Sequence, residues 1–106
     1  MADTQAVRVQ TRDAHTLAIT GALTFATAAT AYADGVAALA QASPVTIELS
    51  GMTEADSAGL ACVLALLALG QRKQPGMRVS EAPQCLRALA RVCDASAWIE
   101  PSSTER

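Results

Sequence analysis

The sequence predicts a single α/β domain in which short strands alternate with helices. Runs of alternating apolar and polar residues, typical of half-buried strands, are separated by segments whose apolar residues recur at helical spacing. The length of 106 residues is enough for one hydrophobic core but not for two. Because 51% of the residues are apolar and only 3% are aromatic, the core is expected to consist of closely packed small aliphatic side chains.

The first part of the chain predicts a hairpin followed by a helix. Residues 7–10 and 17–20 alternate between apolar and polar side chains, and a polar connection separates them. Thr24 is expected to cap a helix that has Phe25 on its apolar face and ends before Pro44. The hairpin therefore delivers the chain directly into the first helix.

The rest of the chain continues the alternation. In order, it predicts a strand over residues 45–49, a helix over 56–70, a strand over 77–80, a helix from 83 to 93 and a short edge strand at 98–99. Such alternation implies right-handed crossovers and an at least partly parallel sheet. The domain is expected to cover residues 1–101, and the polar residues 102–106 are expected to form a frayed tail.

Charge and cysteine content narrow the class of partner and the compartment. A net charge of −2 with scattered Lys and Arg gives no basic patch, so nucleic acid is not an expected partner. Cys62, Cys85 and Cys93 are odd in number and are expected to be reduced thiols packed as small apolar groups, with Cys93 on the inner face of its helix. Without a signal peptide or a membrane-spanning stretch, the expected location is the cytoplasm.

No arrangement of residues predicts catalysis, a metal site or a cofactor. The only histidine, His15, falls in the hairpin connection and is expected to be solvent-exposed. The cysteines lack the C-x-x-C spacing and the nearby histidines of a zinc site. The glycines do not form a nucleotide-binding loop. We therefore expect a non-enzymatic protein.

The segment 53–60, Thr-Glu-Ala-Asp-Ser-Ala-Gly-Leu, is the first feature that points to a function. A strand leads here into a helix and places a serine hydroxyl at the positive end of that helix. Local physics alone favours a helix cap with a small glycine in the first turn. Only one of Asp56 and Ser57 is needed for such a cap, so the other is free for a contact.

The following helix is the second feature, because it is apolar nearly all round. Such a helix must be covered on more than one side. Coverage by the other two helices and docking of a second protein both remain open. The two sides consist of Leu60, Val63, Leu64 and Leu67, and of Cys62, Ala65, Leu66 and Leu69.

Two motifs resemble the STAS domain family, whose members include anti-sigma factor antagonists and MlaB-type subunits of bacterial phospholipid transport complexes. Residues 17–24, Leu-Ala-Ile-Thr-Gly-Ala-Leu-Thr, resemble the second strand and G-x-L turn of the family. Residues 45–50 followed by Asp-Ser-Ala-Gly-Leu at 56–60 are similar to the central strand and its D-[ST]-x-G-L corner. The resemblance implies a four- or five-stranded mixed sheet with three or four helices packed mainly on one face, and no catalysis.

The two branches of the family imply different partners. In the antagonist branch, the serine that matches Ser57 is phosphorylated by a kinase that is itself the anti-sigma factor. In the MlaB branch, the matching hydroxyl contacts the ATPase subunit of the transporter. The turn at residues 21–27 lacks the acids of the antagonist G-E-L-D turn and resembles the MlaB-type G-x-L-T-F, and the apolar helix from Ala61 onward is similar to those of MlaB proteins.

The MlaB resemblance implies an accessory subunit of an ABC-type phospholipid transport complex that maintains outer-membrane lipid asymmetry. Such a subunit binds the ATPase on the cytoplasmic side and touches the inner membrane only through that partner. An anti-sigma factor antagonist is the alternative, and a free-standing structural or metabolic protein is the third, since a fold alone does not settle function. The site is centred on Ser57, and its surrounding surface is expected to comprise Thr53, Glu54, Asp56, Ala58, Leu60 and Ala61.

Overall fold

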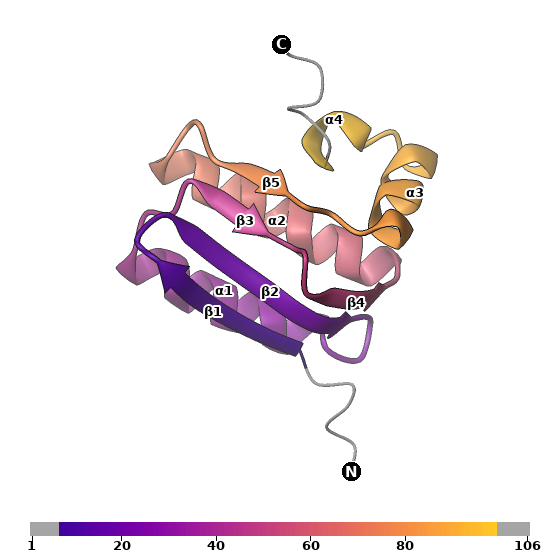
Figure 1. Ribbon diagram of the computed structural model, residues 1–106, viewed down its shortest axis with the longest axis horizontal. Coiled ribbons are helices and arrows are strands. Elements are labelled where there is room, and N and C mark those ends of the chain that lie inside the picture. The colour runs from indigo at the N-terminus through magenta and orange to yellow at the C-terminus, as the bar shows by residue number, and fades with distance from the viewer. Residues whose placement is uncertain (1–6, 100–106) are drawn as a thin grey trace.

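The computed structural model describes residues 7–99, which form a five-stranded mixed sheet with two long helices on one face (Figure 1). The predicted α/β class and mixed sheet are confirmed. The predicted tail at residues 102–106 and the domain end at residue 101 lie outside the described residues. In chain order the elements are β1 (Val7–Asp13), β2 (Thr16–Leu23), α1 (Ala28–Gln41), β3 (Thr46–Glu48), β4 (Met52–Ala55), α2 (Ser57–Lys73), β5 (Arg78–Ser80), α3 (Gln84–Val92) and α4 (Ser96–Ile99).

Strand β2 is the centre of the sheet. On one side it pairs antiparallel with β1, as the predicted hairpin requires. On the other side it pairs in parallel with β3 along its first half and with β4 along its second half. Strand β5 adds in parallel to the outer edge of β3. The β2–α1–β3 and β4–α2–β5 units are the parallel crossovers expected from the alternation of strands and helices.

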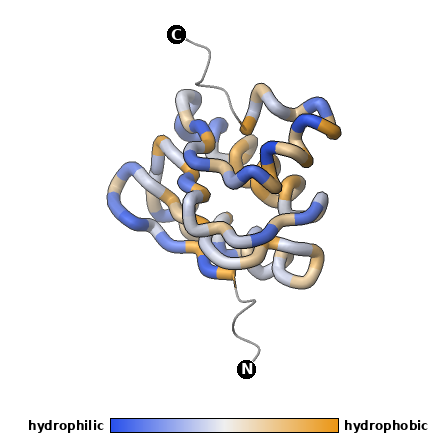
Figure 2. The backbone as a smooth tube through the Cα atoms, turned by 45° about the vertical axis from the view of Figure 1, so that its right-hand side comes forward, coloured by the Kyte–Doolittle hydropathy of each residue, from blue (hydrophilic) through white to orange (hydrophobic). Residues whose placement is uncertain are grey.

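The hydrophobic core lies between this sheet and helices α1 and α2. Pairing aligns Leu17 with Ile47 and Ile47 with Val79, so these side chains share one face of the sheet. All three are at most 2% exposed. No polar or charged side chain of the described residues is buried, which confirms the expected aliphatic core. Hydrophobic and hydrophilic residues alternate along much of the backbone, as amphipathic elements require (Figure 2).

The opposite face of the sheet carries polar side chains. Arg12 on β1 and Glu48 on β3 form an ion pair of 2.8 Å across β2, which lies between them. Ala18 on β2 pairs with Glu48 and is only 1% exposed. His15 lies in the exposed hairpin turn, as expected, and its backbone N–H donates to Asp13 Oδ1.

Close contact between α1 and α2 covers one side of the apolar helix. A Cβ atom at Gly35 would lie 2.7 Å from the Leu66 side chain, so the glycine that interrupts the apolar pattern of α1 lets the two helices approach. Leu66 and Cys62 are buried and therefore belong to the core. The exposed side of α2 instead carries the small residues Ala61, Ala65 and Ala68.

Two predicted element bounds are wrong near the candidate site. Helix α1 begins at Ala28 and not after Thr24, because the Thr24 carbonyl accepts the N–H groups of Thr27 and Ala28 in a separate turn. Phe25 lies in that turn and not on the helix. Residues Met52–Ala55, expected to form a turn, are strand β4, because they pair with the second half of β2 after the break at Gly51.

The predicted edge strand at residues 98–99 is also wrong, because Ser96–Ile99 form helix α4. Asp94 adopts a left-handed φ of 60°, and the Ala95 N–H donates to the Ala90 carbonyl. This geometry ends α3 and turns the chain straight into another helical turn. Helix α4 packs against α3 and β5 instead of extending the sheet.

The expectation of packed thiols holds for one cysteine. Cys62 is buried, whereas Cys85 and Cys93 are exposed. Helix α3 is amphipathic, and Leu86 and Ala90 form its buried side. Cys93 follows the end of this helix, so its predicted inward position is wrong.

Replacing Leu66 with Glu is expected to unfold the domain, at a cost of more than about 4 kcal/mol, because a charge would enter a fully buried position without a partner. The neighbouring Ala65→Glu is the matched control. Ala65 is exposed, so its substitution should change the free energy of unfolding by about 0.5 kcal/mol or less. Urea unfolding followed by circular dichroism measures both. A folded Leu66→Glu protein would contradict the internal position of Leu66.

Candidate functional site

The Asp56 carboxylate joins two segments of the chain at the start of α2. Its Oδ1 accepts the Gly59 N–H at 3.0 Å, which makes Asp56 the N-cap of the helix. Its Oδ2 accepts the Phe25 N–H at 3.0 Å from the turn between β2 and α1. The sequence left open whether Asp56 or Ser57 caps α2, and this geometry assigns the cap to Asp56.

The same hydrogen bonds favour the ionised form of Asp56. Donation from the Phe25 N–H, followed by that from the Gly59 N–H, lowers the pKa of Asp56 below the ordinary value of 3.8. The group is therefore a carboxylate at neutral pH. A carboxylate engaged in this way is a structural tie, unlike a general acid, which must hold a proton.

Gly59 lets the start of α2 lie against the end of β2. A Cβ atom at this position would lie 2.1 Å from the Leu23 carbonyl oxygen, which is far inside van der Waals contact. The obstacle is backbone, so it cannot rotate away like a side chain. The glycine of the D-[ST]-x-G-L corner is therefore required by the close approach of helix and strand.

The side chain of Ser57 takes no part in the hydrogen bonds that hold the corner together. It is the first residue of α2 and is exposed. Within the described residues its hydroxyl forms no hydrogen bond, whereas the neighbouring carboxylate forms two. The hydroxyl thus stands at the positive end of a helix and is free to donate or accept a hydrogen bond from outside.

The residues predicted to surround Ser57 do not all reach the surface. Thr53, Glu54 and Ala61 are exposed, and Asp56 and Ala58 are half-buried. Leu60 is only 3% exposed and belongs to the core. Its assignment to the surface is corrected, because the helix turns this side chain inward.

Phe25 also lies at this corner, where its N–H donates to Asp56, although its sequence pattern did not predict this position. Its side chain is 84% exposed, although its spacing had placed it on the apolar face of α1. The turn that carries it is held by Thr27, whose hydroxyl donates to the Ala22 carbonyl at 2.8 Å and accepts the Thr24 N–H at 2.9 Å. A Thr two residues after an aromatic in a G-x-L-T-F turn was the available signal, since Thr favours such capping roles.

The chemical groups near the corner, among the residues that the structure describes, are a buried thiol, carboxylates and hydroxyls. Burial raises the pKa of the Cys62 thiol, which keeps it protonated and unreactive. Among residues 7–99, no cluster of three or more His, Cys, Asp or Glu side chains could hold a metal ion. What the corner offers is an exposed hydroxyl, the exposed Glu54 carboxylate and an exposed aromatic side chain.

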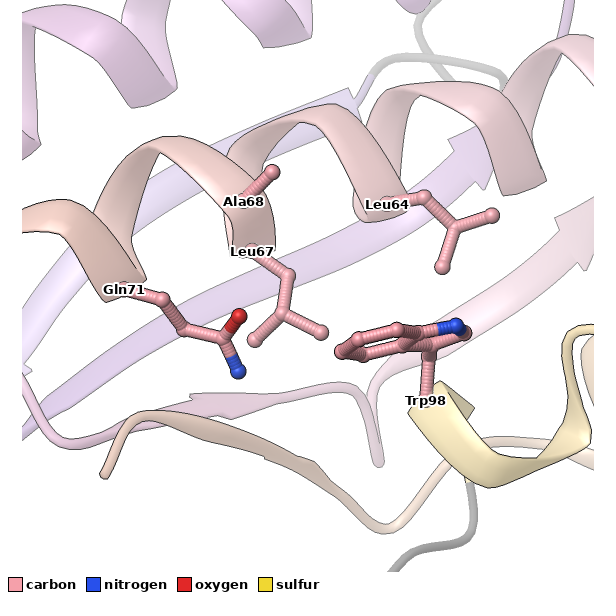
Figure 3. A pocket seen from close by; sticks show the side chains of 5 residues that line it. All are labelled: Leu64, Leu67, Ala68, Gln71 and Trp98. Atoms are coloured by element: carbon pink, nitrogen blue, oxygen red, sulfur yellow. The ribbon is translucent and has the colours of Figure 1, made fainter. Parts of the chain in front are cut away.

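A separate apolar cleft lies on another side of α2 (Figure 3). It has a volume of about 180 Å³ and is lined by Leu64, Leu67, Ala68, Gln71 and Trp98. The Trp98 indole faces the two leucines. The Gln71 amide nitrogen donates to the Met77 carbonyl at 3.0 Å. The described residues of these walls carry no charged side chain, so the cleft suits an apolar group.

Comparison with protein families identifies this combination of sheet and corner. A family model described as "Mlab, STAS domain" matches residues 7–100. The chain belongs to the STAS domain family. STAS domains are in general regulatory or accessory modules that act through protein–protein interactions. No curated protein sequence is similar enough to count as a relative.

Two solved structures share the STAS fold with this chain. The unphosphorylated form of the anti-sigma factor antagonist SpoIIAA matches with a TM-score of 0.65 and 18% identity over 92% of each chain. The phosphorylated form of SpoIIAA, described as a Bacillus cell fate determinant, matches with a TM-score of 0.61 and 18% identity, over 92% of this chain and 96% of that one. At this identity the likeness establishes the fold alone.

Replacing Gly59 with Ala is expected to destabilise this STAS domain by about 3 kcal/mol or more, because the new methyl group would overlap the Leu23 carbonyl. Gly76→Ala is the matched control. A Cβ atom at this position has no atom within 4 Å, so the substitution should hardly change the stability of the domain. Thermal and urea unfolding of both variants measure the difference. Equal stability of the two variants would contradict the close approach of α2 to β2.

The stability of the domain is expected to depend on the ionisation of Asp56 in acid. Because the pKa is lower in the folded chain, the stabilisation is complete above the pKa of an unfolded aspartate and is lost as pH falls through the folded value. Asp56→Asn should therefore be less stable than the wild type at pH 7, with the difference shrinking below about pH 4. Urea midpoints from pH 7 to pH 2 measure this, with exposed Asp34→Asn as the control. A pH-independent difference would contradict the proposed origin.

Proposed function

We propose that this chain is a non-enzymatic, MlaB-like accessory subunit of an ABC-type phospholipid transport complex and that it binds the ATPase subunit through the corner around Ser57. The observation that carries the proposal is that Asp56 and Ser57 differ in their hydrogen bonds. Asp56 caps α2 and binds the neighbouring turn, whereas the exposed hydroxyl of Ser57 forms no hydrogen bond within the described residues. An exposed hydroxyl at the start of a capped helix, with no hydrogen bond to the described residues, is available for a contact with another protein.

Further features support the transport role. The family model that matches nearly the whole chain is the MlaB one. The turn at residues 21–27 has no acidic residue, in contrast to the G-E-L-D turn of antagonists. The proposed transport role needs neither a cofactor nor a catalytic group. The described residues of the corner are not arranged as either kind of site.

The proposed location is the cytoplasmic side of the inner membrane, reached through the ATPase subunit. No helix among the described residues is both long and apolar enough to cross a bilayer. Attachment through a protein partner accounts for a role in lipid transport without direct insertion. The proposed complex maintains outer-membrane lipid asymmetry. Genes for an ABC ATPase, a permease and a lipid-binding protein beside this one would support the assignment.

The second candidate is an anti-sigma factor antagonist controlled by phosphorylation of Ser57. The fold shared with SpoIIAA, which has been solved with and without phosphate, favours this alternative. A phosphate on Ser57 would gain from the helix N-terminus, but it would add a charge of about −1.5 to −2 beside ionised Asp56 and exposed Glu54. This repulsion is the reason to prefer an uncharged contact. A gene for an anti-sigma factor kinase beside this one would favour the alternative.

Substitutions of Ser57 separate the two functions. In the transport role, Ser57→Thr should bind the ATPase subunit like the wild type, and Ser57→Ala should bind about fivefold more weakly through loss of one hydrogen bond. Ser57→Glu should abolish binding by placing an unpaired charge in the interface. Isothermal titration against the purified ATPase subunit measures these affinities, and melting curves should be unchanged throughout.

Ser43→Glu is the matched control, because Ser43 is exposed beyond the opposite end of α1. It should bind the ATPase subunit normally. Wild-type binding by Ser57→Glu would remove the corner from the interface. A mass increase of about 80 Da on Ser57 in protein isolated from its host, the mass of one phosphoryl group, would instead establish the antagonist role.

A further inference from the structure

Phe25 is an exposed aromatic residue whose backbone is tied to a distant segment of the chain. A single exposed aromatic is ordinary on a protein surface. Phe25, however, is 84% exposed while its N–H donates to Asp56, 31 residues later in the chain. Thr27 braces the same turn through hydrogen bonds to Thr24 and Ala22. The ring is therefore presented from an ordered turn, which reduces the entropy lost when it is immobilised by a partner.

One carboxylate connects the segments that carry Phe25 and Ser57. Asp56 accepts the N–H of Phe25 with one oxygen and that of Gly59, in the first turn of α2, with the other. Ser57 adjoins Asp56 in the chain. The free hydroxyl and the exposed ring are therefore carried by two segments that the same carboxylate ties together.

The acidic side chains at this corner are Glu54 and Asp56. Between Thr16 and Gln71 the sequence contains no Lys, Arg or His, and Glu48, another acid of this stretch, is paired with Arg12. Glu54 is exposed on β4, and Asp56 is ionised. The neighbouring elements with basic residues are β1, whose Arg8 pairs with Thr20 of β2, and α3, which packs against β4 and whose Arg87 donates to Gln84. An exposed ring that shares its corner with the exposed Glu54 carboxylate favours an apolar surface with basic residues at its edge.

We propose that Phe25 is the apolar anchor of the Ser57 interface and inserts into an apolar socket of the partner protein that is bordered by Lys or Arg side chains. The inference rests on the proposed function, and the socket would belong to the ATPase subunit. Aromatic residues that fill such pockets dominate the binding energy of many interfaces, and polar neighbours add specificity. An anionic lipid surface is a poor occupant, because it attracts basic and not acidic segments.

Isothermal titration with the purified ATPase subunit tests the anchor. Phe25→Ala should weaken binding at least about tenfold, with an unchanged melting temperature because the ring is exposed. Phe25→Leu should restore part of the affinity. Val92→Ala is the matched control. Val92 on α3 is 85% exposed, and the variant should bind the ATPase subunit like the wild type. Glu54→Gln should weaken binding in low salt and reduce its dependence on salt.

Each contrary outcome has a distinct meaning. If Ser57→Glu fails to bind while Phe25→Ala binds like the wild type, the anchor is wrong and the proposed function stands. If the wild-type chain does not bind the ATPase subunit, the proposed function and the anchor both fail. Phe25-dependent binding to phosphatidylglycerol–phosphatidylethanolamine vesicles would assign the ring to lipid instead. Phe25-dependent self-association in sedimentation experiments would assign it to a second copy of the chain.

Discussion

The bidentate use of the Asp56 carboxylate is the interaction on which the arrangement of the corner depends. A helix N-cap is normally a local device that satisfies N–H groups of the first helical turn. Here the second oxygen extends that device to the Phe25 N–H, in a turn 31 residues earlier in the chain. One side chain thereby fixes where α2 begins and where the turn before α1 lies. The position of Ser57 follows from both.

The close approach of Gly59 to the Leu23 carbonyl makes this arrangement possible. With any larger residue the start of α2 would have to move away from the end of β2. The turn that follows Leu23 carries Phe25, so the same movement would lengthen its bond to Asp56. The aspartate and glycine of the corner therefore have structural roles. A helix cap and a partner contact are not competing explanations of the motif, since they belong to adjacent residues.

The sequence predicted most elements because their patterns are local. The hairpin, the strand around Ile47 and the three longer helices show their periodicity without reference to the rest of the chain. Strand β4 was missed because exposed Thr53 and Glu54 resemble a turn, and only pairing with β2 makes this segment a strand. The four-residue helix α4 was missed because the reversal at Asp94 depends on backbone geometry that hydropathy does not reveal.

In the candidate site, too, the features set by neighbouring residues could be predicted from the sequence, whereas those set by contacts between distant segments could not. Ser57 and its neighbours could be found because they are contiguous in sequence and match a motif. Phe25 could not, because helical spacing places it on α1 and only a hydrogen bond from a distant carboxylate holds it in the turn. Leu60 was assigned to the surface because the motif includes it, whereas the direction of its side chain depends on how α2 packs. Contacts between distant segments thus determined which motif residues face outward.

The distribution of charge along α2 connects the stability of the helix with its proposed use. Asp56 stands at the positive end of the helix dipole, and Arg72 and Lys73 occupy the last turn, where cations are favourable. Lys73 also donates to the Leu39 carbonyl near the end of α1, so this basic end is fixed against its neighbour. The same placement leaves the corner acidic and the far end basic. A partner with a basic socket would be attracted to the corner and repelled by the opposite end, so the charges that stabilise α2 would also orient the partner before any side chain makes contact.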